Sequence, residues 1–163
     1  MTGEVNRLEE QLRRVLEGGA WHGPSVLELL AGITAEQAAS HPIAGAHSIW
    51  EIVLHLRSDY GLVLRRLAGD GRPLTAAEGW PTCPAPTEEN WRQTVRELES
   101  LNEKLRQAVR EFPDERLDDL LVPEVPYTAY TQFIGVTSPM FFNASAKLFA
   151  PVIAPIVLLL NDS

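Results

Sequence analysis

Four side chains that could bind a metal or carry a proton recur at every fourth position of one segment: His47, Glu51, His55 and Asp59. Residues four apart lie one above another on an α-helix, so this spacing places all four on one polar ridge. Such a ridge could hold a divalent cation through an imidazole, with a carboxylate orienting the second ring nitrogen. The alternative is a solvated helix face with weak Glu–His and His–Asp pairs. We favour the solvated face, because charged ridges usually border water.

The other candidate groups form no comparable pattern. His22 stands beside a predicted helix break, and a replacement metal site built from His22, His55 and Asp59 is an option that no spacing requires. Cys83 has neither a basic neighbour nor a second cysteine at ligand spacing, which indicates an unreactive thiol. The sequence shows no nucleophile elbow, P-loop or GxGxxG motif, so nucleotide binding and triad-type catalysis have no support.

The polar ridge belongs to the most clearly predicted helix. Ser48 and Glu51 have the spacing of a capping box, and Gly69 is expected to end the helix. The face beside the ridge carries apolar residues at helical spacing, and we expect it to be buried. Its residues are Ile49, Ile52, Val53, Leu56, Tyr60, Val63 and Leu67.

Before this helix, an apolar stripe over residues 5–16 predicts a first helix that ends at Gly18. Pro24 is expected to open a further helical segment at its first turn, and Thr34 begins a second capping box with Gln37. We therefore predict a first helix that is broken into pieces.

After this helix, residues 70–86 are rich in proline and glycine and show no period. They predict a long ordered loop that crosses an end of the bundle, with Trp80 packed against the body. Thr87 is expected to cap a long helix that reaches Pro113, and Asp114 a short turn. A last helix should begin near residue 127 and be kinked or broken at Pro139.

These segments predict an all-α fold, a four-helix bundle with antiparallel packing, formed by one domain over residues 1–163. The single cysteine and the absence of a leader pattern favour the cytoplasm. The net charge of −8 argues against nucleic-acid binding. The apolar run over residues 148–160 is broken by prolines and is too short to span a membrane, so we expect it in the core or in a homodimer interface.

Three phrases together resemble the DinB/YfiT-like family of metalloenzymes, the DinB superfamily. They are Ala20-Trp21-His22-Gly23-Pro24-Ser25, then Gly45-Ala46-His47-Ser48-Ile49-Trp50-Glu51 followed by His55, and Tyr127-Thr128-Ala129-Tyr130. The likeness runs from about Leu16 to Val136. It implies a four-helix bundle, often a homodimer, with a divalent metal such as zinc or nickel held by three histidines. Members with an assigned activity act as thiol S-transferases or hydrolases.

The resemblance implies that one ligand is His55 and that the other two form an HxxxH pair on the last helix. The corresponding positions here are Pro139 and Asn143. Proline offers no donor atom, and the asparagine carbonyl oxygen is a poor ligand for zinc or nickel. Asp59 and Asn143 are the weak partners left to His55. We therefore interpret the chain as a bundle with a degenerate metal site, a non-catalytic protein that binds a small molecule in its cavity or a protein partner. The alternative is a metal-dependent enzyme of the family type.

Overall fold

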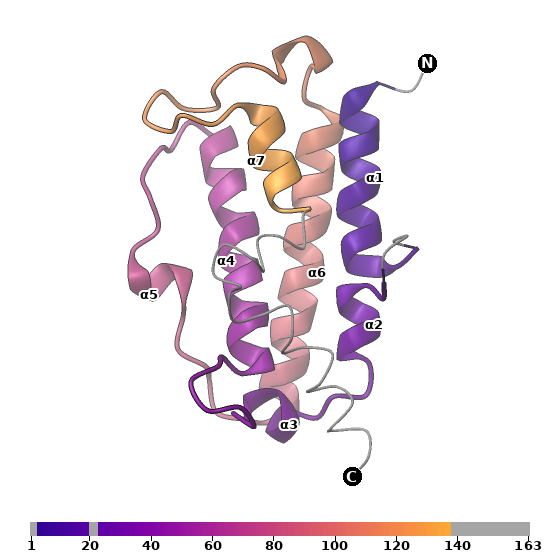
Figure 1. Cartoon of the computed structure of the whole chain (residues 1–163), viewed down its shortest axis with the longest axis vertical. Coiled ribbons are helices and arrows are strands. Elements are labelled where there is room, and N and C mark those ends of the chain that lie inside the picture. The colour runs from indigo at the N-terminus through magenta and orange to yellow at the C-terminus, as the bar shows by residue number, and fades with distance from the viewer. Residues whose placement is uncertain (1–2, 20–22, 138–163) are drawn as a thin grey trace.

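The computed structural model describes residues 3–19 and 23–137, and this part of the chain is built from helices (Figure 1). One isolated antiparallel bridge, between Leu120 and Thr128, is the only strand-like pairing in these ranges. The all-α prediction is therefore confirmed. The elements are α1 (Glu4–Glu17), α2 (Val26–Leu30), α3 (Ala35–Ala39), α4 (Ile49–Leu67), α5 (Ala76–Gly79), α6 (Glu88–Arg110), the 3₁₀ turn η1 (Asp114–Arg116) and α7 (Ala129–Gly135).

The two longest helices, α4 and α6, run in the same direction (Figure 1). The Trp50 indole donates a hydrogen bond to Thr94 Oγ1 at 3.1 Å, and further along both helices, about two turns on α4 and one on α6, Arg57 pairs with Glu97. Because both contact partners move toward the C-terminus of their helices together, the two helices pack in parallel. The expected reversal of direction between these two helices is absent.

The connection between α4 and α6, residues 70–86, explains how parallel packing is reached. An extended stretch of this length can span roughly 55 Å, whereas a helix of 19 residues is only about 28 Å long. The connection runs back along the length of α4 (Figure 1). The prediction that it crosses an end of the bundle is therefore wrong. It carries the single turn α5 on its way.

In contrast, α1 packs against α6 in the antiparallel direction. The amide of Val5, at the start of α1, donates to Asp114 Oδ1 at 2.8 Å, just beyond the end of α6. Asn102, halfway along α6, donates to the Leu12 carbonyl at 3.4 Å. α7 lies beside α4 and α6 in the half of the bundle nearest this end (Figure 1), where Phe133 meets Phe112 edge to face at 5.4 Å between ring centroids.

Side-chain caps begin most of the helices, as local sequence predicts. Complete capping boxes start α3 at Thr34 and α4 at Ser48, and Thr87 caps α6. Two predictions at helix starts were wrong. Ser25 caps α2 with Glu28, so Pro24 lies outside the helix. Asp114 does not cap its own turn, because its carboxylate accepts the Val5 amide.

The core lies where α1, α4 and α6 meet, and α7 packs against it with Ala129 and Phe133. Polar side chains that the apolar pattern did not predict are part of it: Thr94 and Asn102 on α6 are almost fully buried, each in a hydrogen bond to another helix. The predicted kink at Pro139 and the apolar run 148–160 lie outside the described residues.

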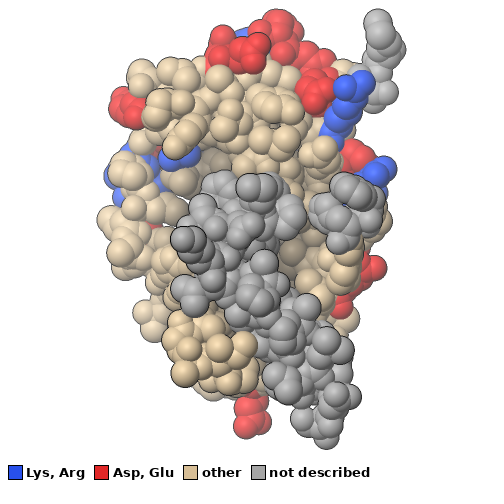
Figure 2. Space-filling view, viewed as in Figure 1, with Lys and Arg blue, Asp and Glu red and all other residues tan. Residues whose placement is uncertain are grey.

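Within the described residues no helix is long and apolar enough to cross a membrane. In the face shown in Figure 2, acidic side chains gather at the end of the molecule where α6 ends and η1 lies. This segment supplies six carboxylates: Glu111, Asp114, Glu115, Asp118, Asp119 and Glu124.

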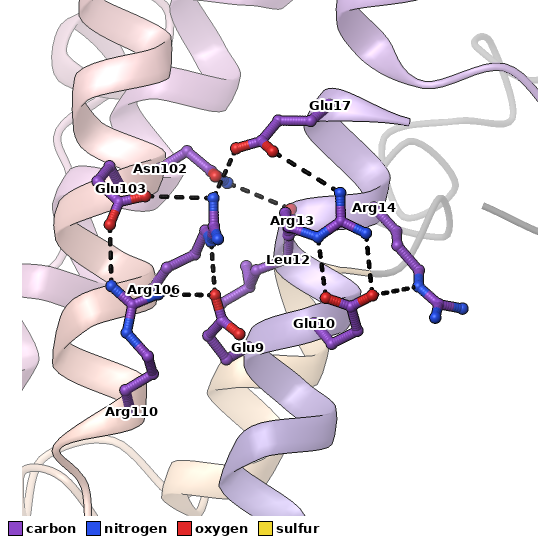
Figure 3. Close-up of polar contacts among 10 residues, drawn as sticks. All are labelled: Glu9, Glu10, Leu12, Arg13, Arg14, Glu17, Asn102, Glu103, Arg106 and Arg110. Carbon is purple, nitrogen blue, oxygen red and sulfur yellow. Dashed lines mark hydrogen bonds and ion pairs between the residues drawn. The ribbon is translucent and has the colours of Figure 1, made fainter. Parts of the chain in front are cut away.

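An ion-pair network joins α1 to α6 outside the apolar core (Figure 3). Arg106 donates through Nε to Glu9 at 2.7 Å and also contacts Glu17 and Glu103. Arg110 reaches the same Glu9 oxygen at 2.8 Å. The side chains of Arg106 and Glu9 are only 12% and 13% exposed, so water screens this pair less than the surface pairs.

We expect Arg106→Ala to lower the free energy of unfolding by roughly 1–3 kcal/mol, because it leaves Glu9 half-compensated in a partly buried position. Urea unfolding followed by circular dichroism measures this change. Arg7→Ala is the matched control, since Arg7 pairs with Glu4 on the surface of the same helix. Equal stability of the two variants would contradict the assigned role of the network.

Candidate functional site

His55 lies on the flank of α4 that faces the connection 70–86. Its Nδ1 is 2.7 Å from the carbonyl oxygen of Gly79, and because a carbonyl only accepts hydrogen bonds, Nδ1 must carry a proton. The other nitrogen, Nε2, is 3.5 Å from Asp59 Oδ2, one helical turn further along α4. The tautomer and the orientation of the ring are therefore set by a backbone group, and Nε2 is directed at a carboxyl.

The indole of Trp80 lies between two imidazoles. Its ring centroid is 4.0 Å from that of His55 and 3.8 Å from that of His47, with interplanar angles of 6° and 8°. The prediction that Trp80 packs the connection against the body is confirmed. The two histidines stand eight positions apart on the predicted ridge, and the tryptophan fills the space between their rings.

Asp59 is the buried member of the ridge, with 12% of its side chain exposed. Burial raises the pKa of Asp59 above its ordinary value, and the neighbouring His55 and Arg66 oppose the shift. Arg66 donates to Gln132 Oε1 at 2.9 Å, which ties this flank of α4 to α7. The sequence interpretation of the whole ridge as a solvated face is therefore wrong at Asp59.

Glu51 organises the other end of the ridge. A single oxygen, Oε2, accepts the Ser48 amide at 2.7 Å and lies 3.0 Å from His41 Nε2 and 3.3 Å from His47 Nδ1. Burial alone would raise the pKa of Glu51, but these donors outweigh it and hold the pKa below its ordinary value. His41, from the segment between α3 and α4, thus joins the cluster.

Cys83, in the same connection, is partly buried. Burial and the nearby negative charge of Glu51 raise the pKa of its thiol. A raised pKa lowers the fraction of reactive thiolate at neutral pH. This agrees with the interpretation of Cys83 as an unreactive thiol.

The metal that the sequence resemblance implies needs at least three converging donors. Among the described residues, no three His, Cys, Asp or Glu side chains come together in a way that could hold an ion. His55 and Asp59 provide two donors on one helix, and the described donor set does not fit the expected site. His22, Pro139 and Asn143 lie outside the described residues.

The Gly79 carbonyl, which is the partner of His55, was not predicted from the sequence. No side-chain pattern marks a backbone acceptor that reaches the helix from a distant loop. One signal was present: Thr75 and Glu78 form a capping box, which predicts a turn of helix and hence a defined backbone at Gly79.

The raised pKa of Asp59 predicts a pH-dependent stability. The folded chain binds this proton more tightly than the unfolded chain, so the wild type loses stability as pH rises from about 3.8, the ordinary value, through the raised folded pKa. Asp59→Asn removes this loss, and its stability relative to the wild type should increase across that window. Urea unfolding over a pH series in chelator measures the difference. Asp118→Asn, at an exposed carboxylate, is the control, and a constant difference for Asp59→Asn would contradict the assignment.

Comparison with known families identifies a matching superfamily. The profile of the DinB superfamily matches residues 19–137, most of the chain, and ends two residues before Pro139. No curated protein and no solved structure matches the chain. The helical bundle with packed α1, α4 and α6 is consistent with the architecture of this superfamily. The chain belongs to the DinB superfamily.

Proposed function

We propose that this protein is a non-catalytic member of the DinB superfamily, a helical bundle that binds a small molecule or a partner protein without a metal. The observation that carries the proposal is the engagement of His55. One nitrogen donates to Gly79 O, the other faces Asp59, and one ring face is covered by Trp80. Among the described residues, no third donor joins His55 and Asp59.

The chemistry of the two remaining expected ligands supports the same proposal. Positions 139 and 143 carry proline and asparagine, and neither side chain supplies the imidazole or thiolate donors that zinc and nickel prefer. A single imidazole with one carboxylate leaves the coordination of such an ion half complete.

A metal-dependent enzyme of the family type is the second candidate, and one observation favours it. His55 donates from Nδ1 to a backbone carbonyl. In many metal sites such a hydrogen bond fixes the orientation of the ring, and Nε2 then binds the metal. In that case Asp59 would be the neighbouring ligand, and the metal would activate a thiol or a water.

Metal binding separates the two candidates. The purified protein is incubated with zinc or nickel, dialysed and analysed for metal content by mass spectrometry. We expect less than about 0.1 ion per chain, because two donors bind too weakly to survive dialysis. His55→Ala should leave this value unchanged.

His41→Ala is the matched control, since His41 is an exposed histidine outside the His55–Asp59 pair. About one ion per chain that is lost in His55→Ala and retained in His41→Ala would contradict the proposal and favour the enzyme. The expected homodimer is part of the same proposal, and light scattering during size-exclusion chromatography tests it.

A further inference from the structure

We propose that residues 70–86 form a strap that opens locally and controls access to the His55–Asp59 flank of α4, with the His47–Trp80–His55 stack as its latch. The strap is the connection that runs back along α4 (Figure 1). It covers His55 at two points: Gly79 holds Nδ1, and Trp80 covers one face of the ring. Opening the strap exposes Nδ1 and this face of the His55 ring.

The central side chain of the latch is Trp80. Trp80 has nearly parallel imidazoles on both faces, at centroid distances of 3.8 and 4.0 Å. Both histidines belong to the body of the molecule, His55 on α4 and His47 just before its cap. The single indole therefore joins the middle of the strap to α4 by two stacked contacts.

The rest of the strap has few attachments to the bundle. Cys83 packs against the core and hydrogen-bonds to Ser48, and the Asn90 side chain donates to the Ala85 carbonyl. Gly79 is its only buried residue, and most of its other side chains are exposed. Its bidentate ion pair, Arg72 with Glu78, lies within the strap and so does not hold it to the bundle. Arg65 reaches the Arg72 carbonyl at 3.2 Å near the end of α4. A segment with few buried contacts opens at a lower free energy than the helices beneath it.

The ends of the strap suit a hinge. Gly69 has a φ of +88°, a backbone conformation that other residues rarely adopt, and it lies directly after α4. At the other end Thr87 caps α6, whose start is held to α3 by the bond from the Ala35 amide to Glu88. Both ends are thus fixed to helices, while the middle is held by the Trp80 stack and by the hydrogen bond from His55 to the Gly79 carbonyl.

Chemical modification of histidine tests the strap. Diethyl pyrocarbonate acylates unprotonated, accessible imidazole nitrogens, and mass spectrometry of peptides reports the rate at each histidine. His55 should react more slowly than the exposed His41 in the wild type. In Trp80→Ala we expect the rate at His55 to rise about tenfold with no change at His41, because the stack no longer competes with opening. His47→Ala, which removes one stacked face, should give a smaller increase.

Trp80→Phe is the conservative variant, since it keeps an aromatic ring in the stack, and it should stay close to the wild type. Thr82→Ala alters an exposed strap residue outside the stack and controls for substitution in the loop. Hydrogen exchange of the strap and of α4 and α6 accompanies each variant. An unchanged rate at His55 in Trp80→Ala overturns the proposal. So does a rate that rises only together with exchange throughout α4 and α6, because access would then require global unfolding.

Discussion

The indoles of Trp50 and Trp91 meet near the first turns of α4 and α6, with ring centroids 5.1 Å apart, and each donates a hydrogen bond to a partner away from its own helix. Together with the ion pair of Arg57 and Glu97 further along both helices, this contact fixes the two helices in parallel. Parallel neighbours cannot be joined by a short turn, so the connection has to return along the length of α4. Its return places Gly79 and Trp80 against His55. The environment of the candidate site is therefore linked to the packing of two tryptophans near the same end of α4.

Local features of the fold were predictable from the sequence, and features that depend on distant segments were not. Capping boxes at Thr34 and Ser48 involve residues three apart, so their chemistry is readable in the chain. The apolar stripe of α1 was predicted for the same reason. By contrast, Asn102 is buried on α6 because the Leu12 carbonyl of another helix accepts its hydrogen bond. The direction of the 70–86 connection likewise depends on contacts between helices that helical spacing does not encode.

The site shows the same division. Helical spacing correctly brought His47 close to Glu51 and His55 close to Asp59. It did not predict that Asp59 would be buried or that Trp80 would separate the two histidines, because both depend on what packs over the ridge. The hydrogen bond from His55 to a carbonyl is equally suited to orienting a metal ligand and to anchoring a loop. The choice between these roles depends on further donors near Nε2, and the described residues supply only Asp59.

The residues that hold the bundle together are separate from those of the ridge. Leu8 and Leu12 of α1 pack in the same core as Leu98 and Leu105 of α6, and the pair of Arg106 with Glu9 closes the edge of that interface. None of these side chains contributes to the His55 environment. Hydrophobic burial of this kind is independent of whether a ligand occupies a neighbouring flank. A helical bundle with this arrangement can lack metal ligands and still keep its fold. The His55 imidazole then has a structural role, because it anchors the connection 70–86 through the Gly79 carbonyl.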